Sequence, residues 1–352
     1  RTELVSLGVH ERGSSSHEVE RLWPLPELLA MAASVRPSAL VLLEHLNLNV
    51  VDPREAQAFF VGLLGCVRNP RGSNERQIHF NMGVCQFHMP FKLSVRRGEP
   101  VDTPQTWPGE VQLWVEDARA AASELRAAGM LAEGQEDVVV TWEGTPLRLL
   151  EAPVRSPPGA HAGGHGRVLH MPVVRHRTAP GTAEGLARWY RALLAARAEV
   201  EAPDGSEGLK RCQVHFDCGD AAWPQVLSFE EDPGVPLPVE GEVVPEAQAY
   251  HICVYLESDD AFREAFRRAE RAGLLFVNER FEGGPLEFAS ASDWSEAECA
   301  CQFRVLELRD PAEGGRLLLR LEHEVRGPGH KCFPLSGPPA RAEPPAWSEV
   351  AP

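Results

Sequence analysis

The stretch LEHLNLNVVDPREAQAFFVGLLGC (43–66) joins an alternating strand to a capped helix, and the rest of the chain repeats this order. Polar residues from His45 to Asn49 alternate with apolar ones, which is typical of a strand with one buried face. Asp52 then precedes Pro53, a capping residue followed by the residue best suited to the first helical position. We therefore expect a strand that leads directly into a helix, which a glycine ends.

Two short apolar runs, QIHFNMG (77–83) and VCQFHMP (84–90), follow this helix and meet at Gly83, which predicts a hairpin. The first unit therefore reads as βαβββ. The same order recurs from about residues 111, 168 and 250. QVHFDCG (213–219) agrees with 77–83 at four of seven positions. Internal duplication explains this agreement better than chance does.

Composition and charge restrict the class of protein. The 352 residues, 43% of them hydrophobic, can form two domains. The formal charge of -16 argues against nucleic acid and anionic membranes as partners. Eight cysteines without a CxxC pair predict reduced thiols and an intracellular, soluble protein. No apolar run has the length of a membrane span.

The two ends are expected to lie outside the repeated units. Residues 1–40 form an N-terminal extension with a predicted helix over 26–35, and residues 327–352 form a Pro-rich tail with seven prolines. The chain begins at Arg1, which fits either a trimmed chain or a mature product after transit-peptide removal. The expected compartment is therefore the cytoplasm or the interior of an organelle.

These segments resemble the vicinal oxygen chelate superfamily, which includes glyoxalase I, extradiol dioxygenases and fosfomycin and bleomycin resistance proteins. The resemblance is carried by residues 45–66 and by HICVYLES (251–258), which look like opening strands of two units. It implies an α+β fold of four βαβββ units in two paired glyoxalase-like domains with curled, barrel-like mixed sheets. The domains are expected at 41–155 and 168–326, joined by a Pro- and Gly-rich linker at 156–167.

The resemblance also implies a divalent metal held by side chains of the strands. His45 matches the first-strand ligand, and His251 and His170 take the corresponding places in the fourth and third units. Glu322 matches the closing-strand carboxylate. Glu324 is the candidate proton shuttle, or an alternative ligand because it shares a strand face with Glu322. Such a set suits Fe, Mn, Ni, Zn or Co, and no nucleotide cofactor is expected.

One half of the molecule is expected to lack this site. In the second unit the ligand positions fall at Glu110 and Arg148, and an arginine would oppose a divalent cation. Each candidate also has a purely structural interpretation. His45 can be a cleft histidine bonded to its neighbours, and the charged closing strand can be an exposed edge. His79 and His215 can be a duplicated core position.

Two functions follow from these observations. The first is a metal-dependent enzyme that acts on a small oxygen-bearing molecule, either a glyoxalase-like lyase or isomerase or a dioxygenase. The alternative is a non-catalytic binding protein or an accessory subunit of a larger, organellar assembly, with the extension and tail supplying contacts. The expected partners are a small molecule, a second copy in a homodimer, or the subunits of that assembly.

Overall fold

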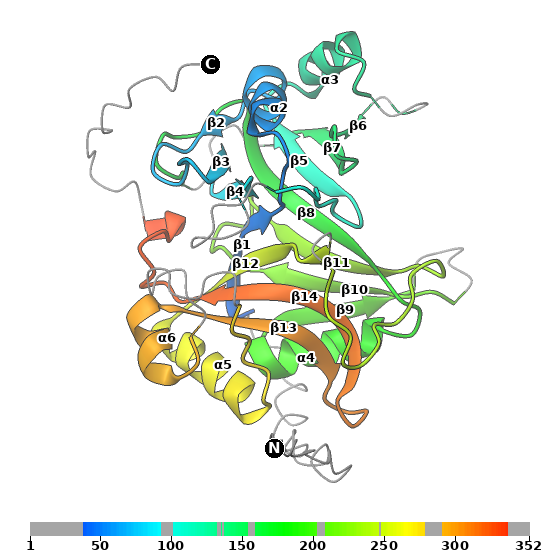
Figure 1. The fold of residues 1–352 in the computed structure, drawn as a ribbon, viewed down its shortest axis with the longest axis vertical. Helices are drawn as coiled ribbons and strands as arrows, with labels where there is room; N and C mark the ends of the chain where they lie inside the picture. Colours follow the sequence, from blue (N-terminus) through cyan, green and yellow to red (C-terminus); the bar gives the residue numbers. More distant parts are fainter. Residues whose placement is uncertain are drawn as a thin grey trace, which may run out of the picture.

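The structure is a computed structural model that describes residues 38–92, 101–131, 135, 137–153, 159–202, 208–245, 248–278 and 291–336. The predicted helix over 26–35 and residues 337–352 of the tail lie outside the described residues. Two mixed, seven-stranded sheets form the body of the protein, with helices at its two ends (Figure 1). This confirms the α+β class and fits two paired glyoxalase-like domains, although neither sheet closes into a barrel within the described residues.

The first sheet combines strands of the first and fourth units, in the order β13, β14, β12, β1, β4, β3, β2. β1 and β12 are antiparallel at its centre, while β4 runs parallel to β1 and β14 runs parallel to β12. The strands of this sheet are β1 (Leu40–Asn47), β2 (Val67–Arg68), β3 (Gln77–Met82), β4 (Cys85–Pro90), β12 (His251–Leu256), β13 (Gln302–Asp310) and β14 (Arg316–Arg326).

The second sheet combines strands of the second and third units, in the order β6, β7, β5, β8, β11, β10, β9. Here β5 and β8 are the antiparallel central pair. The strands of this sheet are β5 (Val111–Val115), β6 (Val138–Val140), β7 (Pro146–Glu151), β8 (Val168–Thr178), β9 (Arg197–Glu201), β10 (Arg211–Phe216) and β11 (Gln225–Glu231).

The pairing of the units differs from the sequence-based expectation. We expected consecutive units to pair, whereas the first unit pairs with the fourth and the second with the third. The physical reason is that units join through the edges of their opening strands, and any two such edges offer the same backbone hydrogen bonds. The strand patterns therefore do not specify partners. The domain boundaries at 41–155 and 168–326 stay a prediction.

Local signals in the first unit are confirmed. Helix α2 (Pro53–Gln57) begins at Asp52, whose side chain accepts a hydrogen bond from the Arg54 N–H. The helix continues as a π-helix, η2 (Ala58–Leu63). The β3–β4 hairpin turns at Gly83, whose φ of 61° favours glycine.

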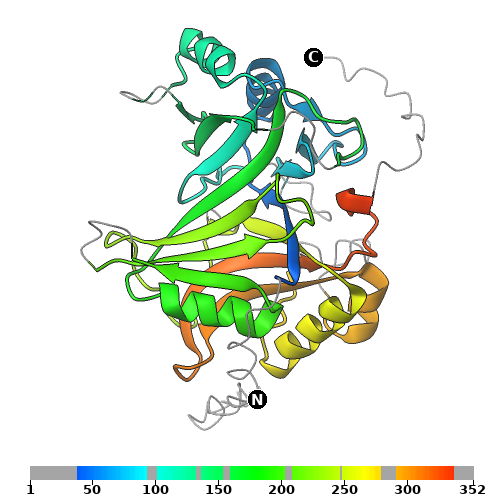
Figure 2. The same cartoon turned by 180° about the vertical axis from the view of Figure 1, so that it is seen from behind.

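The remaining helices lie at the two ends of the molecule. In Figure 1, α2 and α3 lie at one end, and α4, α5 and α6 lie at the other. Figure 2 shows α4 and α5 beside each other from the opposite side. None of the described helices is long and apolar enough to cross a membrane. The helices at the two ends, besides α2, are α3 (Ala118–Ala127), α4 (Ala183–Leu194), α5 (Asp259–Arg271) and α6 (Trp294–Ala300). The short 3-10 helix η5 (Pro334–Ser336) follows β14.

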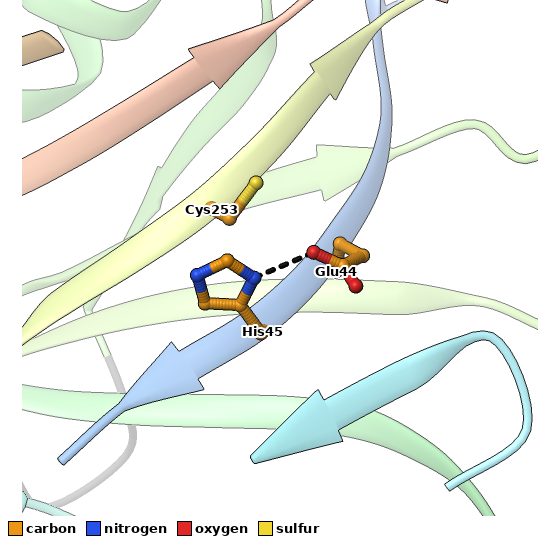
Figure 3. A group of neighbouring side chains, drawn as sticks. All are labelled: Glu44, His45 and Cys253. Carbon is orange, nitrogen blue, oxygen red and sulfur yellow. Dashed lines mark hydrogen bonds and ion pairs between the residues drawn. The ribbon is translucent and has the colours of Figure 1, made fainter. Parts of the chain in front are cut away.

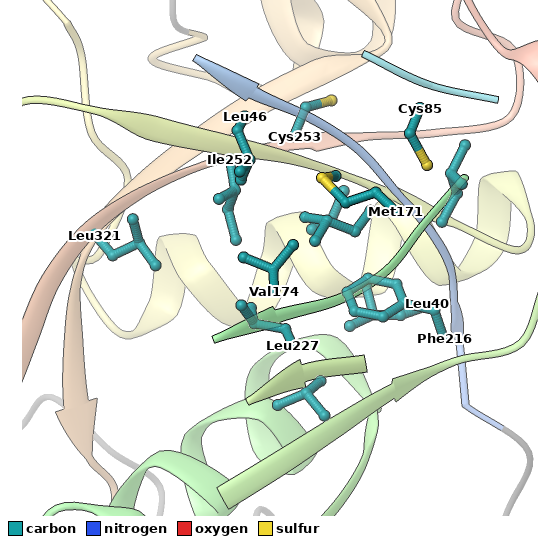
Figure 4. Close-up of a cluster of buried hydrophobic side chains, with 14 of the residues drawn as sticks. Leu40, Leu46, Cys85, Met171, Val174, Phe216, Leu227, Ile252, Cys253 and Leu321 are labelled. Carbon is teal, nitrogen blue, oxygen red and sulfur yellow. The ribbon is translucent and has the colours of Figure 1, made fainter. Parts of the chain in front are cut away.

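A buried apolar layer lies between the two sheets (Figure 4). Leu46 and Ile252 of the first sheet and Val174 and Leu227 of the second are all fully buried. Because neighbouring residues of a strand point to opposite faces, the residues next to Leu46 and Ile252 point to the other face of the first sheet. That other face carries His45 and His251.

Candidate functional site

Strand register brings the candidate residues of the first sheet together. On β12 and β14, which are parallel, His251 lies opposite Glu322 and Cys253 lies opposite Glu324. On β1, His45 lies opposite Cys253. Side chains two residues apart on a strand share a face, so both histidines and both glutamates reach the same side of the sheet.

His45, His251 and Glu324 form a compact three-residue group. The Nε2 atoms of His45 and His251 are 3.4 Å apart, and Glu324 Oε2 lies 3.5 Å from His251 Nε2. One ligand atom from each residue lies within 4.8 Å of the others. The three residues are 0%, 2% and 3% exposed. Three of the five predicted site residues therefore converge in the first sheet.

Glu44 is a site residue that the sequence analysis missed. The β1–β12 register pairs Leu43 with Val254 and then His45 with Cys253, so Glu44 is the extra residue of a β-bulge. Its Oε2 atom lies 2.5 Å from His45 Nδ1 (Figure 3). The signal that could have revealed it is a lone carboxylate in an otherwise apolar run.

The Glu44 carboxylate stays ionised although it is buried. Burial raises its pKa, but the electrostatic interactions and hydrogen bonds with His45 and His161 outweigh burial and hold the pKa well below its usual range. When His45 donates Nδ1–H to this carboxylate, its Nε2 lone pair points to His251. This pair therefore fixes the tautomer that a metal-binding histidine needs.

Two buried arginines neutralise the closing-strand carboxylates. Arg304 on β13 donates one Nη to Glu322 and the other to Glu324. Arg326 forms an ion pair with the second oxygen of Glu324. Burial raises the pKa of Glu324, but Arg304 and Arg326 outweigh it and hold that pKa below its usual range. Sequence analysis missed both arginines: the register of β13 with β14 brings Arg304 to Glu324, and Arg326 lies two residues after Glu324 on β14 itself.

Glu322 lies beside the three-residue group without joining it. Besides Arg304, it accepts hydrogen bonds from Asn278 Nδ2 at 2.9 and 3.2 Å. The carboxylate that faces the two histidines is therefore that of Glu324, whereas the sequence favoured Glu322 as the ligand.

His170 lies on β8 of the second sheet and does not meet His251, contrary to the expected set. Its ring packs against Trp114 and Trp223, and its Nε2 lies 3.2 Å from the Pro224 carbonyl oxygen. Burial lowers its pKa to about 4. The physical reason is the sheet pairing, which separates the third unit from the fourth.

The corresponding positions of the second sheet hold an ion pair. Arg148 Nε donates to both oxygens of Glu110 at 3.0 Å, and its Nη1 lies 2.7 Å from Asp137 Oδ2. Arg148 is therefore paired with two carboxylates in the second sheet, and the absence of a metal site there stays a prediction.

A column of stacked histidines supports His45. The rings of His45 and His88 stack with centroids 3.6 Å apart, and those of His88 and His79 stack at 3.5 Å. Burial lowers the pKa of His79 to about 3, and it also holds that of His88 well below its usual range. The rings of His79 and His88 are therefore neutral, and the stacking restricts the orientation of His45.

A segment of the predicted linker, residues 159–166, covers the group, and we call it the strap. His161 Nε2 lies 3.1 Å from Glu44 Oε1 and 2.9 Å from the Val84 carbonyl oxygen. Asn81 Nδ2 donates to the carbonyl oxygens of Ala162 and Gly164, both at 2.9 Å. The strap is therefore attached both to the β3–β4 hairpin and to the site.

The donor set fits a divalent transition metal. Ligand atoms bonded to one ion at 2.0–2.2 Å lie roughly 3 to 3.5 Å from each other, which matches the separations of His251 Nε2 from His45 Nε2 and from Glu324 Oε2. Two imidazoles and one carboxylate suit Fe, Mn, Co, Ni or Zn. Glu44 would act as the outer carboxylate that orients a metal-bound histidine.

Several solved structures are similar to this chain, whereas no protein-family model and no curated protein matches its sequence. Glyoxalase I from Zea mays has 11% identity and a TM-score of 0.49, covering 81% of this chain and 92% of that one. A catechol 2,3-dioxygenase has 14% identity and a TM-score of 0.26, covering 83% and 96%. The 2,2',3-trihydroxybiphenyl 1,2-dioxygenase from Sphingomonas wittichii has 12% identity and a TM-score of 0.25, covering 82% and 90%. These matched proteins are members of the vicinal oxygen chelate superfamily.

Proposed function

We propose that the chain is a metal-dependent enzyme of the glyoxalase and dioxygenase type that acts on a small molecule with neighbouring oxygen atoms. The observation that carries this proposal is the buried group of His45, His251 and Glu324, with Glu44 bonded to the first histidine. In this proposal Glu324 is a ligand and not the proton shuttle. In this proposal only the first sheet is active, because the groups of possible metal ligands among the described residues lie there.

In this proposal His45, His251 and Glu324 hold the metal, and Glu44 and the strap support them. A divalent metal held there would act as a Lewis acid on two adjacent oxygens of the substrate. Glu44 keeps His45 in the tautomer that presents Nε2. The strap excludes water, which strengthens electrostatic interactions inside the site.

Metal analysis of the purified protein tests the proposal. We expect stoichiometric Fe, Mn, Co, Ni or Zn, lost in His45→Ala and in His251→Ala. The control is His170→Gln, which alters a buried histidine of the other sheet and should retain the metal. A wild-type protein that binds none of these metals after reconstitution would rule out the enzyme. Turnover of a 2-oxoaldehyde thiol adduct would indicate a lyase, and oxygen uptake with a catechol would indicate a dioxygenase.

A non-catalytic binding protein or accessory subunit is the second candidate. The observation that favours it is that Arg304 and Arg326 both form ion pairs with Glu324, the carboxylate that faces the two histidines. Native mass measurement from the source tissue separates the two candidates. A stable complex with other chains and no bound metal supports the accessory subunit, whereas a metal-containing monomer or homodimer supports the enzyme.

A further inference from the structure

Arg304 and the metal compete for the same carboxylate oxygen. Arg304 is 2% exposed, and its Nη2 donates to Glu324 Oε2. That oxygen is also the atom that lies 3.5 Å from His251 Nε2. A divalent cation bound there would lie next to the guanidinium in a buried site, where like charges repel strongly.

The second arginine, Arg326, is held by several groups other than Glu324. Arg326 donates from Nε to Gln302 Oε1 at 3.0 Å and from Nη1 to Tyr255 Oη at 3.1 Å. It also lies 3.4 Å from Glu44 Oε2. These contacts hold Arg326 in place whether or not Glu324 turns toward a metal.

Glu322 offers Arg304 an alternative partner. The guanidinium already bridges Glu322 and Glu324, which lie two residues apart on one face of β14. Asn278 holds Glu322 from the other side. Arg304 can therefore release Glu324 and keep a full ion pair with Glu322, so that no buried charge is left without a partner.

We propose that Arg304 is a positioning residue that sets the metal affinity of the site by competing for Glu324, and that Glu322 holds Arg304 when the metal is bound. This inference rests on the proposed function. It assigns Glu322 a task other than direct ligation. It also predicts that Mg²⁺ and Ca²⁺, which need additional oxygen ligands, do not displace the arginine.

Metal affinity measured by competition with a chromogenic chelator tests the first part. For Zn²⁺ and Co²⁺ we expect Arg304→Gln to bind about 10- to 100-fold more tightly than wild type, the range typical of groups around a metal. Arg304→Lys, which keeps one charge, should be intermediate. Arg309→Gln is the matched control, because Arg309 is on the same strand and pairs with Glu240 and Glu307 away from the site. Circular dichroism confirms that each variant is folded.

A double-mutant cycle tests the role of Glu322. Glu322→Gln should weaken Zn²⁺ binding by roughly 10-fold in the wild-type background, because Arg304 then binds Glu324 alone. It should have no effect in the Arg304→Gln background. Weakening in both backgrounds would make Glu322 a ligand and overturn the inference. Unchanged or weaker metal affinity in folded Arg304→Gln would also overturn the inference, but it would leave the proposed enzyme standing. If neither wild type nor Arg304→Gln bound any metal, the proposed enzyme itself would be refuted.

Discussion

The Nε2 atoms of His45 and His251 lie 3.4 Å apart, although 206 residues separate the two histidines in the chain. His45 is on the opening strand of the first unit, and His251 is on the opening strand of the fourth. The contact is made across the central antiparallel pair of the first sheet. A metal bound by both side chains would therefore connect the opening strands of the first and fourth units.

Metal binding should stabilise the folded protein, because the unfolded chain does not bring these ligands together. Zn²⁺ or Co²⁺ at about 100 times its Kd should add about 3 kcal/mol to the free energy of unfolding. The measurement is urea-induced unfolding with metal and with a chelator. The same comparison in His251→Ala should show no difference between the two conditions. A stabilisation that persists in this variant would place the metal elsewhere.

Gln225 should be required for the bulge that presents Glu44. From β11 of the second sheet, its Nε2 donates to the carbonyl oxygens of Leu43 and Met171 at 2.8 and 3.1 Å. Its Oε1 accepts the Leu43 N–H at 2.7 Å. Gln225→Leu would leave both backbone groups of Leu43 buried without this partner, at a cost of about 2 to 4 kcal/mol.

Urea unfolding of Gln225→Leu, compared with Gln213→Leu, measures this cost. Gln213 lies on β10 and contacts the exposed Glu201, so its replacement should change the stability little. Equal stability of the two variants would show that the bulge does not depend on Gln225. The metal affinity of Gln225→Leu should also fall, since the bulge sets the position of the Glu44 carboxylate beside His45.

Much of the fold could be predicted because it depends on local patterns. The pair Asp52–Pro53 marks the start of α2, whereas β1 (Leu40–Asn47) begins before the alternating stretch, ends two residues after His45 and is buried on both faces. The partner of each sheet edge could not be predicted, because opening strands offer equivalent edges. The arrangement of units therefore became clear only from the register of β1 with β12.

The site was predictable where it follows from the repeat and not where it follows from tertiary contacts. His45 and His251 occupy equivalent places in their units, and the structure brings them together. Glu44 depends on a bulge and Arg304 on the register of a neighbouring strand, and no spacing in the sequence encodes either. His170 has the right place in its unit but lies in the other sheet.

Asn81 should control access to the site, because it attaches the strap. Its fully buried side chain donates to the carbonyl oxygens of Ala162 and Gly164. Asn81→Ala removes both bonds, so amide hydrogen exchange across 159–166 should become at least about 10-fold faster, as expected when roughly 1.4 kcal/mol or more is lost. Metal uptake and release should accelerate together, with little change in affinity. Asn74→Ala, in the turn before β3, is the control. Unchanged exchange in 159–166 would contradict this attachment.

The pH dependence of stability should reflect buried neutral histidines. His176 and His323 are fully buried, and burial lowers the pKa of each to about 4. Unfolding restores a pKa of about 6.5, so the unfolded chain binds more protons between these values. Their contribution to stability is therefore complete above about pH 6.5 and is lost as the pH falls toward 4. For each of these two histidines, the free energy of unfolding should fall by about 2 kcal/mol between pH 7 and pH 5.

Replacing one of these histidines with an apolar ring should remove its share of the acid sensitivity. His176 lies among the rings of Trp107, Tyr250 and Phe229, so phenylalanine suits its surroundings. In urea unfolding at pH 7 and pH 5, His176→Phe should lose about 2 kcal/mol less than wild type on acidification, because its ring takes up no proton on unfolding. His165→Gln alters an exposed histidine and should behave as wild type. If the free energy of unfolding fell equally in His176→Phe and in wild type on acidification, His176 would not be one of the neutral groups that cause the acid sensitivity.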